Sequence, residues 1–110
     1  MAKYAVMIFE KVLPENLPKE VMEAHGSLPD RIAEQGGKVL AGLALEPPET
    51  ATSIRGGQIT DAPFIETKEV LNGIYLLEAN DLDHAIACAR MTPIVDGGVE
   101  VRPLFDWQVL

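Results

Sequence analysis

The chain has 110 residues and a formal net charge of −8, with 47% hydrophobic and 24% charged residues. This length suits a single compact domain over residues 1–110, and no apolar run is long enough to span a membrane. The negative charge argues against nucleic acid as a partner, because phosphate binding depends on clustered Lys and Arg. Cys88 is the single cysteine, and the short apolar N-terminus lacks a cleavage site, so we expect a cytoplasmic protein.

The first half of the chain reads as strand, helix and strand. Residues 3–9 and 38–45 are apolar at nearly all positions, as is typical of strands covered on both faces. Between them an apolar stripe at helical spacing places His25 toward the core: Val21, His25, Leu28 and Ile32. Pro29 cannot donate to the His25 carbonyl, which predicts a kink or a restart of the helix. Gly36-Gly37 marks the helix end.

The second half begins with a short hairpin. Its strands are expected at residues 51–55 and 58–61, because Gly56-Gly57 suits a two-residue turn that needs positive φ. The remaining elements are a strand at 74–77, a helix capped by Asp81, a strand at 99–102 and an alternating apolar tail with Phe105, Trp107 and Val109. His84 lies opposite the apolar stripe of the second helix, so we expect it in solvent.

This element order indicates an α+β fold with an antiparallel sheet, two helices on one face and a hairpin insert. Two helices cover only one face, yet three strands are apolar on both faces. An exposed apolar face of that size promotes aggregation unless something covers it. We therefore expect a homodimer through sheet faces, with the apolar tail able to reach the partner.

The stretch Asp61-Ala62-Pro63-Phe64, followed by Glu66 and Lys68, resembles the motif of the DGPF branch of the YCII-related family. Further matching positions are His25, Glu69, Gly73, Asp81, Asp83, Ala85 and residues 99–103. The resemblance implies a ferredoxin-like fold of the dimeric α/β-barrel superfamily, with a pocket between the sheet and its helices. Ala62 replaces the family's glycine, but a residue before proline favours extended backbone, so we expect the motif to keep its shape.

The resemblance implies that His25 and Asp61 act as a catalytic pair on small molecules. A carboxylate that accepts a hydrogen bond from one imidazole nitrogen leaves the other nitrogen free to act as a general base. The alternative is a core histidine that is bonded for structural reasons alone.

Four further residues are candidates for substrate binding: Glu66, Lys68, Phe64 and Arg102. Glu66 and Lys68 lie two residues apart, so they could equally form an ion pair that holds a loop. The alternatives are a core role for Phe64 and a solvated strand face for Arg102. No set of ligands has the spacing of a metal site, and no glycine-rich phosphate loop follows a strand, so we expect neither metal nor cofactor.

The sequence thus predicts a small-molecule-binding domain. Its candidate chemistry is cofactor-independent proton transfer in the isomerisation, elimination or hydrolysis of a small organic acid, phenol or lactone. The alternative is a non-catalytic module for ligand sensing or protein interaction, which the resemblance links to regulation by extracytoplasmic-function sigma factors.

Overall fold

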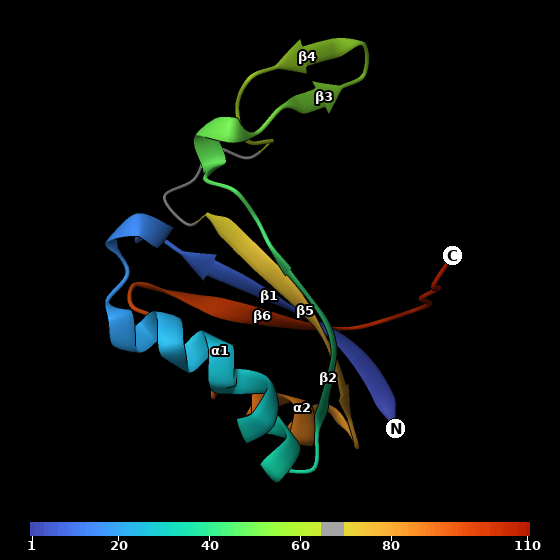
Figure 1. The fold of residues 1–110 in the computed structure, drawn as a ribbon. Coiled ribbons are helices and arrows are strands. Elements are labelled where there is room, and N and C mark those ends of the chain that lie inside the picture. Colours follow the sequence, from blue (N-terminus) through green and yellow to red (C-terminus); the bar gives the residue numbers. More distant parts are fainter. Residues whose placement is uncertain (65–69) are drawn as a thin grey trace.

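The computed structural model describes residues 1–64 and 70–110. An antiparallel sheet in the strand order β2-β5-β1-β6 forms its body (Figure 1). The four strands are β1 (Ala2–Glu10), β2 (Lys38–Ala44), β5 (Leu71–Ala79) and β6 (Gly97–Pro103). A helix connects β1 to β2 and another connects β5 to β6, which is the ferredoxin-like arrangement. The predicted α+β class and sheet are confirmed.

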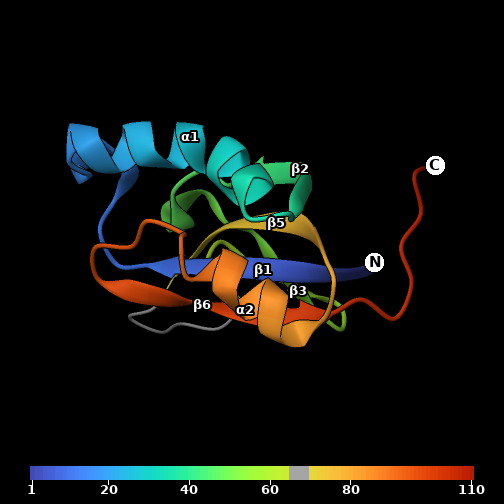
Figure 2. The same cartoon turned by 90° about the horizontal axis from the view of Figure 1, so that it is seen from below.

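Alternate residues of β1 point to opposite faces of the sheet. Tyr4 and Val6 are buried in the core beneath the helices. Ala5, Met7 and Phe9 point the other way, to a face that no described helix covers (Figure 2). We call this the open face. The strand register places these further residues on it: Leu43, Leu71, Ile74, Leu76, Gly98, Glu100 and Arg102.

Helices α1 (Lys19–Glu34) and α2 (Leu82–Ala89) lie together on the face opposite the open face (Figures 1 and 2). Leu28 and Ile32 of α1 are buried, as the apolar stripe predicted. The helix does not restart at Pro29, because α1 runs through this residue as one helix; the alternative, a kink, stays a prediction. A proline removes a single donor, and the buried side chains on either side of it stabilise the turn.

The start of α2 is held by two polar residues. Asp81 caps the helix as predicted, since its Oδ1 accepts the backbone N–H of His84 at 2.8 Å. The expectation that His84 lies free in solvent is wrong, because its ring is half-buried between the ends of both helices. Its Nε2 lies 2.7 Å from the Gln35 carbonyl oxygen, and its Nδ1 accepts the Asn80 N–H at 3.0 Å.

A short hairpin, β3 (Ser53–Arg55) and β4 (Gln58–Thr60), extends beyond one end of the sheet (Figure 1). Gly56 has a φ of 58°, which confirms the predicted need for positive φ in this turn. Short 3-10 turns lie at Pro14–Asn16 and Pro48–Thr50. Among the described residues, no helix has the length and apolar character needed to cross a membrane.

Candidate functional site

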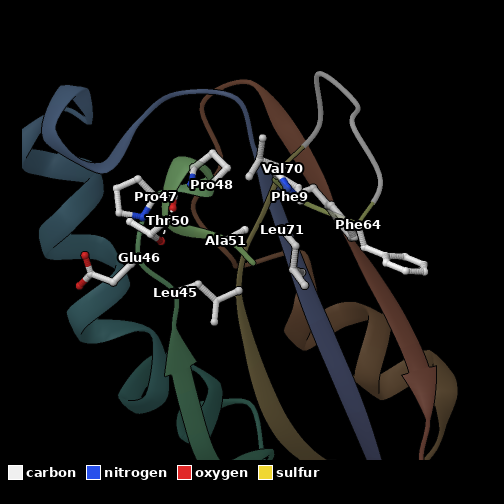
Figure 3. A pocket seen from close by; sticks show the side chains of 11 residues that line it. Phe9, Leu45, Glu46, Pro47, Pro48, Thr50, Ala51, Phe64, Val70 and Leu71 are labelled. Carbon is white, nitrogen blue, oxygen red and sulfur yellow. Dashed lines mark hydrogen bonds between the residues drawn. The ribbon is translucent and has the colours of Figure 1, made fainter. Parts of the chain in front are cut away.

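A cavity of about 610 Å³ lies at the end of the open face, beside the base of the hairpin (Figure 3). Its lining consists mainly of apolar residues: Phe9, Leu45, Glu46, Pro47, Pro48, Thr50, Ala51, Pro63, Phe64, Val70 and Leu71. Phe9 and Leu71 are partners across β1 and β5. Each belongs to the open-face set, so the cavity continues that face. We call it the open-face cavity.

Prolines give the opposite wall of the cavity its shape. Pro47 and Pro48 follow β2 and start the 3-10 turn Pro48–Thr50, since their fixed φ values stop the strand and favour a turn. Thr50 Oγ1 donates to the Pro47 carbonyl at 2.6 Å and closes this turn. A wall built in this way loses little conformational entropy when a ligand binds, because it is already ordered.

Two lining residues lie at the rim of the cavity. Glu46 is the ionisable residue among the described lining residues, and its carboxylate points outward (Figure 3). Phe64 is exposed, and the Arg55 guanidinium lies over its ring at 3.9 Å from the centroid. The cavity therefore has an apolar interior and a polar rim.

Asp61 lies just after β4, where it is exposed to solvent. In the described part of the chain, no hydrogen bond or ion pair joins it to His25. Ala62 keeps a φ typical of L-residues, since no described residue other than glycine has a positive φ. The Ala62 carbonyl accepts a hydrogen bond from Ser53 Oγ, and an extended backbone at Ala62 stays a prediction.

His25 lies on the helix side of the sheet, half-buried in α1. Burial is the largest influence on its pKa and lowers it below the usual value of 6.5, and the Arg31 cation lowers it further. The negative charge of Glu10 and the Pro93 carbonyl act in the opposite direction and raise the pKa. The balance favours the neutral imidazole.

Glu10 is the carboxylate whose charge acts on the pKa of His25. The sequence alone did not identify it as a site residue. It is only 5% exposed, yet its Oε1 accepts the Val95 N–H at 2.7 Å and its Oε2 accepts the Asp96 N–H at 2.8 Å. Burial raises the pKa of Glu10. The backbone N–H donors together lower the pKa by more than burial raises it, so the net pKa is below 4.5.

Arg31 completes this polar cluster on the helix side. Its Nη2 donates to the Ala24 carbonyl at 3.2 Å and to the Met91 carbonyl at 3.4 Å. Glu10 and Arg31 thus hold both ends of the loop between α2 and β6, and His25 lies beside the same loop at Pro93. His25 therefore has a structural role beside this loop that does not depend on any catalytic role.

The other expected substrate contacts are spread over the molecule. Arg102 lies on the open face, where its Nε is 3.8 Å from Glu100 Oε2, and it does not line the cavity. Glu66 and Lys68 lie outside the described residues. Phe64 lines the cavity, and its contact with a ligand stays a prediction. Within residues 1–64 and 70–110, no group of His, Cys, Asp and Glu has the geometry to hold a metal ion.

A family model for the YCII-related domain matches residues 2–108. The chain belongs to the YCII-related family. It is also similar to an uncharacterized protein of Rhizobium meliloti (strain 1021), with 38% identity over 77 residues. The aligned segment covers 64% of this chain and 62% of that protein, so it spans less than two thirds of the relative.

In this YCII-related domain the two candidate sites lie on opposite faces of the sheet. The open-face cavity has room for a ligand but offers little acid–base chemistry. His25, on the helix side, is a residue suited to proton transfer, but it does not line this cavity. Cavities are recognised in a sequence only with difficulty, because their lining residues look like core residues.

Proposed function

We propose that this YCII-related domain binds a small, largely apolar molecule in the open-face cavity. The observation that carries the proposal is the cavity itself, whose volume of about 610 Å³ falls in the usual range for ligand sites, roughly 300–1,000 Å³. The net charge of −8 and the carboxylate at the rim disfavour an organic acid. We therefore expect a neutral phenol or lactone as the ligand.

Filling the cavity should abolish this binding. Leu45 lines it, so Leu45→Trp is expected to weaken binding of phenols or lactones at least tenfold, as measured by ligand-induced shifts in Tm and by titration NMR. Ile59→Trp is the matched control, because Ile59 is exposed on β4 and does not line the cavity. Unchanged binding in Leu45→Trp would contradict the proposal, as would preferential binding of carboxylates.

Proton transfer by His25 is the second candidate function. Burial lowers the pKa of His25, so the ring is neutral near pH 7, which is the form that a general base requires. In a screen of phenols and lactones for turnover, His25→Gln should lower any rate by roughly 10²- to 10⁴-fold, whereas His84→Gln should retain it. The rate should also fall as the pH drops through the lowered pKa, because a protonated ring cannot accept a proton.

The same screen separates catalysis from ligand sensing. If the parent protein binds a ligand in the cavity but turns over no member of the screen, the result would support the non-catalytic alternative, a sensing module linked to sigma-factor regulation. A His25→Gln variant that turns over substrate as fast as the parent would contradict the proton-transfer proposal.

We further propose that the protein belongs to the DGPF branch, which residues 61–64 support, and that it is cytoplasmic, which the free, buried Cys88 supports.

We also infer that two copies associate through their open faces. The apolar side chains there are only partly covered, and Leu43 is 63% exposed. Uncovered apolar patches of this kind usually mark an interface. A two-fold axis lets the same face cover itself in a second copy.

A further inference from the structure

The C-terminal tail leaves the sheet with most of its apolar side chains exposed. Leu104 still donates its N–H to the Lys3 carbonyl at 3.0 Å, and the chain then runs away from the sheet and both helices (Figure 1). Phe105 and Leu110 are fully exposed, and Trp107 is 42% exposed with the Lys3 ammonium 5.4 Å from its ring centroid. Such side chains gain free energy from any apolar surface that removes them from water.

A shallow hollow lies at the other end of β6. It has a volume of about 270 Å³ and is lined by Phe9, Gly97, Gly98, Val99 and Glu100. A Cβ atom on Gly98 would meet nothing within 4 Å, so the space above this residue is open. The fold of a single copy does not require a glycine at this position. Because glycine has no side chain, it leaves room on the open face. We call this the Gly98 hollow.

The tail and the Gly98 hollow lie at opposite ends of the same strand. Consider two open faces stacked on a two-fold axis that runs parallel to the sheets and perpendicular to the strands. This axis reverses the strand direction but keeps β6 above β6, so each tail meets the hollow end of the other copy. Stacked sheets lie about 10 Å apart, a gap that a few extended residues span.

The charges on β6 agree with the same axis. Glu100 and Arg102 are neighbours on the open face, and their side chains are 54% and 71% exposed. When the strand direction is reversed, Arg102 of each copy lies near Glu100 of the other, so an acid and a base meet twice. Such a pair is self-complementary, which favours this pairing over one that brings like charges together.

We propose that the aromatic tail of each chain packs into the Gly98 hollow of a second copy. Phe9 lines both the hollow and the open-face cavity, so Phe105 and Trp107 of one copy would extend the wall of the cavity in the other. This inference rests on the proposed association of open faces and on the cavity as a ligand site. It adds that each site is complete only in the dimer.

Two variants test the packing. Gly98→Leu, which fills the hollow, and deletion of residues 105–110 should each raise the Kd of the dimer at least tenfold in sedimentation equilibrium experiments. Gly57→Leu is the matched control, because Gly57 also has nothing within 4 Å, lies in the hairpin turn and has no positive φ. It should leave the Kd unchanged. Circular dichroism shows whether each variant keeps its fold.

A cross-link identifies the occupant of the hollow. A Phe105→Cys chain mixed with a Gly98→Cys chain should form a disulfide-linked pair on oxidation, and the buried Cys88 should not compete. If the doubly substituted chain instead closes a disulfide within itself at high dilution, the tail covers its own sheet and the inference is wrong. It is also wrong if the parent protein is a monomer at micromolar concentration, or if both variants dimerise like the parent.

Ligand binding separates this inference from the proposed function. The tail deletion should weaken binding of a phenol or lactone that Leu45→Trp abolishes. If the deletion leaves ligand affinity and the dimer unchanged while Leu45→Trp still abolishes binding, the tail inference fails and the cavity stands. If neither protein nor its parent binds any member of the panel, the cavity proposal fails, and the cross-link alone decides the tail inference.

Discussion

Gly97→Ala is expected to destabilise the fold by about 3 kcal/mol or more, or to prevent folding, because the backbone of the paired strand β1 comes very close to this residue. An added Cβ would overlap the Phe9 carbonyl oxygen and lie 3.1 Å from the Glu10 Cα. Both obstacles are backbone atoms, so no side chain can move aside. The strand pair β1–β6 would have to separate where Glu10 meets Gly97.

The neighbouring glycine provides the control for this experiment. Gly98 lies in the same strand, but an added Cβ would meet nothing within 4 Å, so Gly98→Ala should change the free energy of unfolding by less than about 1 kcal/mol. Urea denaturation of both variants, followed by circular dichroism, gives the comparison. Equal losses at the two positions would show that the close approach of β1 to Gly97 does not limit stability.

Glu10→Gln is expected to lower stability by about 2 kcal/mol at pH 7, because it exchanges a carboxylate for an amide where the N–H groups of Val95 and Asp96 donate at short distance. The amide can accept one of these bonds, but its NH2 group faces the other donor. The folded pKa of Glu10 is lowered below 4.5, so its contribution is present above that value and is lost as the pH falls through the folded pKa. The difference between parent and variant should therefore shrink in acid.

Thermal unfolding between pH 7 and pH 3 measures this effect. Glu15→Gln is the control, since Glu15 is exposed and has no such donors among the described residues. His25 lies near Glu10 and also titrates, so the series should be repeated in a His25→Asn background. A difference between parent and Glu10→Gln that stays constant down to pH 3 would show that the ionised carboxylate does not anchor the loop.

Local features of the chain were enough to predict most of the fold. Short runs that are apolar at nearly all positions located β1, β2 and β5, because strands covered on both faces carry apolar side chains on both. Asp81 and Gly56 were read correctly because a helix cap and a tight turn depend on residues close in sequence. The restart at Pro29 was wrong, since packing across the helix outweighs the loss of one donor.

The candidate site was predicted less completely, because it depends on contacts between distant parts of the chain. Glu10 looked like the polar end of an apolar strand, yet it accepts N–H groups from Val95 and Asp96. His84 of α2 likewise forms a hydrogen bond with the carbonyl of Gln35, the residue that ends α1. The backbone donors and acceptors that these side chains meet carry no signature in the sequence.

The amino-acid sequence was thus sufficient for the class of fold, the family and the presence of an apolar face without a covering helix. Only the tertiary structure showed that this face carries the cavity while His25 lies on the other side of the sheet. The physical reason is that periodicity and capping are short-range, whereas the cavity forms where Phe9 of β1 and Leu71 of β5 meet Leu45, which follows β2. The close approach of β1 to Gly97, too, appears only when distant segments pack.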